Sequence, residues 1–89
     1  MIHETLLTYQ SYHQLLIELG YSRRLSKENV YVYEHKDSDS TLLLRPRADS
    51  ERILPRELAA HQFQLVQMGI ITEEELISKV AQLTLQETP

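Results

Sequence analysis

Apolar residues recur at helical spacing near the start of the chain. In the stretch ETLLTYQSYHQLLIELG, the apolar positions lie three or four residues apart, which places them along one face of a helix. The face consists of Tyr12, Leu15, Leu16 and Leu19, and Leu6 and Tyr9 extend it backwards. Gly20 follows, at the position where a left-handed C-terminal cap suits glycine. The pattern therefore predicts a first helix over residues 5–19.

The pattern changes to an alternation of period two in the middle of the chain. Val30 and Val32 alternate with Tyr31 and Tyr33, so the valines point to one face of a strand and the tyrosines to the other. β-Branched and aromatic residues on both faces are typical of a strand that is partly covered on each side. The alternation predicts a strand over residues 29–35.

Two further strands are indicated beside this one. The stretch STLLLR predicts a strand over residues 40–45. The intervening KDSD has no glycine, so it predicts a loop of about four residues around a type I turn. Residues 21–25 predict a short strand whose apolar character is diluted by Arg23 and Arg24. Together, the segments predict a small antiparallel sheet of two to three strands.

The C-terminal part of the chain returns to helical spacing. Pro55 suits the first turn of a helix, and Gly69 stands just past the end of the stretch ELAAHQFQLVQMG. One stripe of this helix consists of Leu58, Ala59, Gln62, Leu65 and Val66, all apolar except the glutamine. Residues 72–75 read TEEE, which predicts a capping box at the start of another helix. The apolar face of that helix consists of Leu76, Ile77, Val80 and Leu83. Residues 86–89 are expected to fray.

The order of these elements indicates the fold class. Helices bury their apolar faces against a small antiparallel sheet most simply when they pack on one of its faces. The order α-β-β-β-α-α therefore predicts an α+β fold with the helices on one face of the sheet. A chain of 89 residues makes a single domain over residues 1–89.

Composition narrows the classes of protein. The chain has no cysteine, which excludes disulfides, thiolate metal sites and cysteine nucleophiles. No apolar run reaches the ~20 residues that a membrane span needs. The start, MIHETLLTYQ, lacks the basic and apolar regions of a signal peptide, so a cytoplasmic protein is expected. The histidines do not combine with one another or with carboxylates into a metal-ligand set, so we expect no metal and no cofactor.

Charge is distributed unevenly along the chain. The net charge of −4 argues against general affinity for nucleic acid, yet eight of the nine basic residues lie between positions 23 and 56. Six arginines are candidates for contact with RNA or another anion: Arg23, Arg24, Arg45, Arg47, Arg52 and Arg56. Tyr31 and Tyr33 are candidates for stacking on bases if their face of the sheet is open.

A structural interpretation of the same residues stands beside the functional one. The two tyrosines can instead cover one side of a thin sheet. The arginines that follow the last strand can pair with Asp49, Glu51 and Glu57. His61 lies beside the apolar stripe of its helix, which is typical of a histidine at the boundary of a core.

Three stretches of the chain, LLIELGYSRR, NVYVYEH and MGIITEEELI, resemble segments of the HicA-type (YcfA-like) toxin family. They are similar to that family's first helix and short strand, its second strand, and its closing helix. The family consists of small mRNA interferases, which are RNA-cleaving toxins on a double-stranded-RNA-binding-like α-β-β-β-α scaffold. The resemblance covers most of the chain and implies the same scaffold.

The chain departs from that family at the catalytic position. The family's catalytic histidine belongs to a Gly-Ser/Thr-His motif at the start of the second strand, and the equivalent residues here are Glu28, Asn29 and Val30. Valine cannot accept or donate a proton, so the resemblance implies a chain without the family's general acid/base. His35 is the remaining candidate for a catalytic base, and the alternative is an exposed histidine at a strand end.

Three functions are compatible with these observations. The first is a non-catalytic protein-interaction module. It would bind a protein partner by strand addition at an edge strand, or a second copy through the two C-terminal helices, which carry many apolar residues. The second is RNA binding without cleavage through the basic segment of residues 45–56. The third is an active ribonuclease toxin that uses His35. Salt dependence separates the first two, because phosphate contacts weaken steeply as the salt concentration rises.

Overall fold

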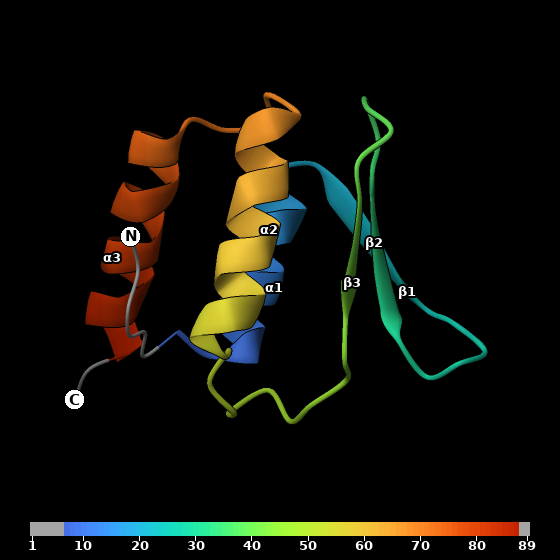
Figure 1. Ribbon diagram of the computed structural model, residues 1–89. Helices are drawn as coiled ribbons and strands as arrows, with labels where there is room; N and C mark the ends of the chain where they lie inside the picture. The colour runs from blue at the N-terminus through green and yellow to red at the C-terminus, as the bar shows by residue number, and fades with distance from the viewer. Residues whose placement is uncertain (1–6, 88–89) are drawn as a thin grey trace.

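The computed structural model of the protein describes residues 7–87. Its elements, in chain order, are α1 (Tyr9–Glu18), β1 (Tyr21–Leu25), β2 (Tyr31–His35), β3 (Thr41–Leu44), α2 (Pro55–Gln67) and α3 (Glu73–Glu87). The α+β class and the order α-β-β-β-α-α are those that the sequence predicts. Figure 1 shows the strands as one sheet, with the helices on one side of it and the other face uncovered.

The first helix begins at Tyr9, which corrects the predicted start at residue 5. Thr8 is the N-cap, and its side-chain oxygen accepts a hydrogen bond from the Ser11 amide at 3.3 Å. A threonine side chain at this position satisfies one of the amides that the first turn leaves without a partner. Residues 5 and 6 lie outside the described residues.

The segment before α1 pairs with the connector between β3 and α2. The Leu7 carbonyl accepts a hydrogen bond from the Ile53 amide at 2.9 Å, and Thr8 forms an isolated antiparallel bridge with Arg52. Leu7 and Ile53 are both almost fully buried. This long-range pairing explains why the helix starts late, because Thr8 is held in an extended conformation.

Gly20 ends α1 as the sequence predicts. Its φ of +103° is in the region that residues with a side chain rarely adopt. A Cβ atom at this position would also lie 3.0 Å from Nε2 of His35. Glycine therefore allows the chain to turn from α1 directly into β1, while the end of β2 approaches closely.

The sheet has the order β1-β2-β3, and both pairs of strands are antiparallel. On β2, Tyr33 lies opposite Leu42 of β3, and both side chains are buried beneath the helices. Val32 lies opposite Leu43, on the uncovered face. The predicted alternation of valines and tyrosines is therefore confirmed.

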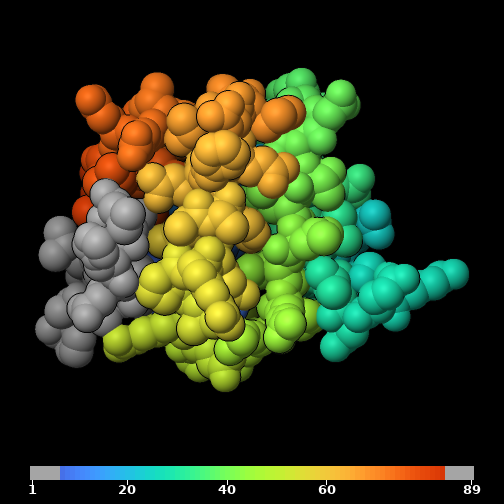
Figure 2. All heavy atoms as spheres, viewed as in Figure 1, coloured from blue at the N-terminus to red at the C-terminus, as the bar shows by residue number. Residues whose placement is uncertain are grey.

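Strand β1 has the predicted bounds, whereas β2 and β3 are shorter than their patterns predict. Asn29 has a φ of +61° and belongs to the turn that precedes β2, so this strand begins at Tyr31. Strand β3 begins at Thr41, and the preceding Ser40 is buried with its hydroxyl sharing a hydrogen bond of 2.7 Å with the Tyr21 hydroxyl. Figure 2 shows the turn between β1 and β2 projecting from the body of the molecule.

Local capping chemistry fixes the starts of the last two helices. Pro55 is the first residue of α2, and the carboxylate of Glu57 accepts a hydrogen bond from the Leu54 amide at 3.3 Å. Before α3, the Thr72 hydroxyl accepts a hydrogen bond from the Glu75 amide at 3.2 Å and donates one to the Glu75 carboxylate at 3.0 Å. The predicted cap of α3 is confirmed.

The buried faces of these helices differ in detail from the predicted stripes. Ala59 and Ile77 are exposed, whereas His61 is buried. Helix α3 continues to Glu87, so residues 86 and 87 are helical, and residues 88 and 89 lie outside the described residues.

A single cluster of apolar side chains fills the space between the sheet and the helices. Its fully buried members include Leu7, Tyr12, Leu15, Leu16, Tyr33, Leu42, Ile53, Leu58, Leu65 and Leu76. Helix α3 lies beside α2 and farther from the sheet (Figure 1). The packing therefore leaves one face of the sheet and the outer edge of β1 as surfaces.

Candidate functional site

The outer edge of β3 is closed by side chains of α2. The ladder to β2 leaves the backbone groups of Thr41 and Leu43 pointing outward. Nε2 of His61 donates a hydrogen bond to the Leu43 carbonyl at 2.9 Å, and the side-chain amide of Gln64 donates one to the Thr41 carbonyl at 2.8 Å. A strand that approached this edge would find both acceptors occupied and a helix in its path.

His61 is held in this position by a second buried hydrogen bond. The Tyr12 hydroxyl donates to Nδ1 of His61 at 2.6 Å, and the two rings stack with their centroids 5.7 Å apart. Nε2 must carry a proton to reach the Leu43 carbonyl, which fixes the tautomer of the neutral ring. Burial lowers the pKa of His61, against the opposing effects of the Leu43 carbonyl and Glu57. His61 is therefore a neutral structural group near pH 7.

The outer edge of β1 has no such cover. Its ladder to β2 leaves the backbone groups of Tyr21, Arg23 and Leu25 pointing outward. Within residues 7–87, these groups form no hydrogen bond. The edge is also accessible, since the side chains of residues 22–25 are all exposed and that of Leu25 is 57% exposed. The described part of the chain therefore presents one open strand edge, at β1.

Two guanidinium groups stand on opposite faces of β1. The Cζ atom of Arg23 lies 4.2 Å from the centroid of the Tyr31 ring on the helix side, at a distance suited to a cation–π contact. Nε of Arg24 donates to the Glu34 carboxylate at 2.9 Å on the uncovered face, and both of these side chains are more than half exposed. The open edge therefore carries one guanidinium on each face, and that of Arg24 is paired with the Glu34 carboxylate.

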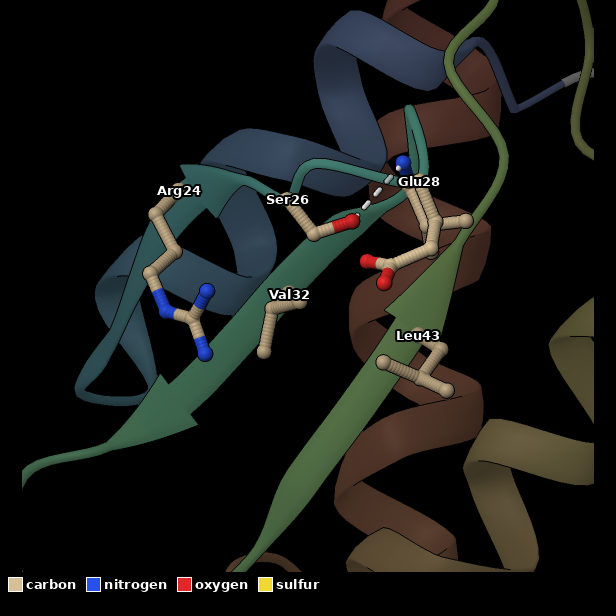
Figure 3. Close-up of a pocket in the computed structure, with 6 residues that line it drawn as sticks. Arg24, Ser26, Glu28, Val32 and Leu43 are labelled. Carbon is tan, nitrogen blue, oxygen red and sulfur yellow. Dashed lines mark hydrogen bonds between the residues drawn. The ribbon is translucent and has the colours of Figure 1, made fainter.

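The uncovered face of the sheet contains a shallow hollow of about 340 Å³. Figure 3 shows the side chains that line it, with Arg24, Ser26, Glu28, Val32 and Leu43 labelled, and Val30 is the sixth residue of the lining. Arg24, Val32 and Leu43 form a row across the sheet, because Val32 lies opposite both of the others. Val32 is buried at the floor, whereas Leu43 is 60% exposed. The hollow thus combines an apolar floor with charges of both signs at its rim.

His35 acts as a structural cap on the neighbouring helix. Its Nε2 donates a hydrogen bond to the Leu19 carbonyl at 2.8 Å, and its Nδ1 accepts one from the Asp37 amide at 3.2 Å. The ring also packs edge-on against Tyr21, with centroids 5.0 Å apart. Both ring nitrogens are engaged, so this geometry leaves neither to accept a proton from a substrate.

The two candidate stacking residues lie on the helix side of the sheet. Tyr33 is 1% exposed, and its hydroxyl shares a hydrogen bond of 3.0 Å with Nδ1 of His13. Burial raises the pKa of Tyr33 and lowers that of His13. Tyr31 is partly buried beneath Arg23. The condition for base stacking, an open tyrosine face, is therefore not met for Tyr33, and the uncovered face carries Val30 and Val32 instead.

The remaining arginines occupy the connector and the start of α2. All four are exposed: Arg45, Arg47, Arg52 and Arg56. The expected pairing of these arginines with Asp49, Glu51 and Glu57 is not found. Among the described side chains of residues 7–83, the one ion pair joins Arg24 to Glu34.

Glu57 has a different role from the one expected. Its carboxylate accepts a hydrogen bond of 2.7 Å from the Tyr9 hydroxyl, in addition to the one from the Leu54 amide. Burial, and then the bond to Glu57, raise the pKa of Tyr9 to about 12. The guanidinium of Arg47 lies 5.9 Å from the centroid of the Tyr9 ring. Glu57 is therefore engaged in joining α1 to α2.

The residues that sequence reasoning missed are the ones that close the β3 edge. His61 and Tyr12 are far apart in the chain, and Gln64 has no pattern that marks it. The one sequence signal for this contact is the position of His61 beside the stripe of its helix. That position is equally typical of a histidine at the boundary of a core that closes no strand edge. The six candidate arginines are all exposed, and they divide between the two faces of β1, the connector and the start of α2.

Within residues 7–87, no group of three or more histidine, aspartate or glutamate side chains is arranged to hold a metal ion. No helix in the described part of the chain combines the length and apolar character needed to cross a membrane. Comparisons with protein-family models, with curated proteins and with solved structures give no match.

Proposed function

We propose that this chain is a non-catalytic protein-interaction module on a HicA-like scaffold, and that it recruits an extended segment of a partner protein to β1. The observation that carries the proposal is the difference between the sheet edges: α2 closes the edge of β3, while the edge of β1 is accessible. Extended peptides bind such edges by adding a strand, with main-chain hydrogen bonds supplying affinity and alternate side chains supplying specificity.

The small area of the sheet favours binding of a partner at the β1 edge over binding at the uncovered face alone. Strands of this length and number cover roughly 250 Å². A stable interface takes about 800 Å² from each partner. The uncovered face around Leu43 supplies only part of that area, and a strand at β1 would extend the same surface, because Arg24 belongs to both.

The chemistry of the histidines supports a function without catalysis. His35 caps α1, His61 closes the β3 edge, and His13 bonds to Tyr33. Val30 stands where the family that the chain resembles has its catalytic histidine, and its side chain lines the hollow. Each of these histidines uses a ring nitrogen in a hydrogen bond within the fold, and valine cannot accept or donate a proton.

Affinity capture with matched variants tests this proposal. Wild type, Leu25→Pro and Phe63→Ser would be immobilised and exposed to nuclease-treated lysate of the organism that encodes the chain. Proline at position 25 removes an outward amide and leaves both arginines, whereas Phe63 is exposed on α2. A protein retained by wild type and Phe63→Ser but lost by Leu25→Pro supports strand recruitment. Equal capture by all three, or no capture, would overturn it.

RNA binding is a second candidate function, favoured by one observation. Arg45, Arg47, Arg52 and Arg56 are exposed and form no ion pair with the described side chains. Electrophoretic shift of single- and double-stranded RNA at low and moderate salt tests it, since phosphate contacts weaken as salt rises. A salt-sensitive shift that Arg45→Ala or Arg47→Ala weakens supports RNA binding. A shift that neither variant changes counts against this segment as the contact.

A further inference from the structure

We infer that the edge of β1 selects an acidic extended segment and rejects a second copy of this chain. The inference rests on the proposed function, and it deepens that function by naming the chemistry of the partner. It is carried by the placement of Arg23 and Arg24 next to outward-facing backbone groups of the open edge.

The two arginines mark both faces of any strand added at this edge. Consecutive residues of a strand point to opposite faces, so Arg23 lies on the helix side with Tyr31 and Arg24 on the uncovered side with Glu34. Side chains of an added strand would lie directly beside each guanidinium. Opposite charges in such cross-strand positions stabilise the pair, whereas like charges destabilise it.

A second copy of β1 is a poor occupant for the same reason. An antiparallel pairing of all five residues of β1 with their counterparts places Arg23 directly opposite Arg23 of the other copy. The neighbouring register toward the turn places Arg24 opposite Arg24. A register shifted toward the start of β1 places neither arginine opposite its own copy, but it pairs fewer of the five residues of β1 and so forms fewer hydrogen bonds between the two strands. The arginines therefore act against self-pairing while leaving the edge open to a partner with carboxylates.

The partner segment can be described from the order of residues along β1. Beside Arg23 and Arg24 it carries two consecutive acidic residues, one for each face, and beside the exposed Leu25 it carries an apolar residue. Arg24 already bonds to Glu34, so a new carboxylate there partly replaces an existing contact. Arg23 has no ion pair with a described side chain, so the contact at Arg23 is expected to contribute more.

The test is an NMR titration of the labelled protein with three capped heptapeptides. The first is Thr-Val-Glu-Glu-Thr-Val-Thr, the second has both glutamates replaced by lysine, and the third keeps the glutamates but is N-methylated at alternate residues on its hydrogen-bonding side. We expect the acidic peptide to shift the amide signals of β1 residues. Affinity should fall at least tenfold for the lysine peptide and for the N-methylated peptide.

Titration of two arginine variants with the same peptides separates the contributions of the two guanidinium groups. Arg23→Thr should weaken the acidic peptide more than Arg24→Thr does. Equal binding of the lysine peptide would overturn the charge preference and leave strand recruitment standing. Equal binding of the N-methylated peptide, or no binding of the acidic one, would overturn the inference, and the capture experiment with Leu25→Pro would then decide the proposed function by itself.

Sedimentation of the protein alone tests the rejection of a second copy. We expect wild type to remain monomeric at concentrations where the double variant Arg23→Thr/Arg24→Thr begins to dimerise. A wild-type dimer that Leu25→Pro dissociates would show that β1 pairs with itself and would overturn this part of the inference.

Discussion

The two edges of one small sheet show two ways of preventing uncontrolled strand pairing. At β3, helix α2 lies alongside the edge, and the side chains of His61 and Gln64 donate hydrogen bonds to its outward carbonyls. Of these two side chains, that of His61 is buried. At β1, the backbone groups are left accessible and two arginines stand beside them. The first device closes the edge to every strand, whereas the second excludes only strands of the wrong charge.

The difference has an energetic consequence. Closing the β3 edge requires buried polar groups, and these stabilise the fold only while every one of them is hydrogen-bonded. The arginines beside the β1 edge are exposed, so this edge requires no polar group in the core. Substitutions at the β3 edge should therefore lower the free energy of unfolding, whereas substitutions at the β1 edge should leave it almost unchanged.

His61→Ala gives the largest effect that this comparison predicts. The substitution leaves the Leu43 carbonyl and the Tyr12 hydroxyl without their partner and creates a cavity beside them. We expect the free energy of unfolding to fall by about 3 kcal/mol, as measured by urea denaturation. Gln64→Ala removes the exposed bond of the same edge and should cost less than about 1 kcal/mol. Equal losses for both variants would contradict the special role of the buried histidine.

Tyr12→Phe should have an intermediate effect. It retains the buried ring but leaves Nδ1 of His61 without a donor, so we expect a loss of about 1–2 kcal/mol. Tyr31→Phe is the matched control, because the Tyr31 hydroxyl has no hydrogen-bond partner among the described residues and its ring is only partly buried. A loss in the control as large as that in Tyr12→Phe would show that the hydroxyl bond is not the cause.

Acid should destabilise the fold through two histidines, of which His61 closes the β3 edge. Burial lowers the pKa of His61 and of His13 below their ordinary value of about 6.5. The unfolded chain therefore binds more protons than the folded one, and stability is lost as the pH falls from about 6.5 through the folded pKa of each histidine. Glu57, facing His61, and Asp49, facing His13, oppose the shifts, whereas Arg23 adds to the shift of His13.

Thermal unfolding between pH 7.5 and 5 measures this linkage. The control is His61→Gln, which keeps a side-chain donor but does not titrate. We expect a shallower dependence of the melting temperature on pH in this variant than in wild type. Identical slopes would mean that protonation of His61 is not linked to folding.

Arg23→Thr is expected to have the smallest effect on stability. The side chain is exposed, and threonine suits a strand, so the free energy of unfolding should change by no more than about 0.5 kcal/mol. Urea denaturation under the conditions used for His61→Ala checks this. A loss of several kcal/mol would mean that the contact with Tyr31 supports the fold, and the contrast between the edges would then fail.

Much of the fold was predictable because its signals are local. Gly20 ends a helix where glycine is needed, and Thr72 with Glu75 begins one in the expected way. The alternation from Val30 to Tyr33 gave the faces of β2 correctly. Each of these signals depends on residues within a few positions of one another, so one sequence is enough to recognise it.

The closed edge could not be predicted in this way. Tyr12, His61 and Leu43 come from three elements, and their contacts depend on how α1 and α2 settle over the sheet. The same limitation affected Glu57, which was expected to pair with arginine but bonds to Tyr9 across the helices. Periodicity indicates which face of an element is buried, but not which polar groups meet there.

The pairing of Leu7 and Thr8 with the connector also bears on the order of folding. The hairpins of β1, β2 and β3 close short loops, which is fast, whereas the contact of Leu7 with Ile53 joins the start of the chain to its middle. We therefore expect the hairpins to form the nucleus and this contact to form after the transition state. A weakened contact at Ile53 would then shorten the lifetime of the native state while leaving the refolding rate almost unchanged.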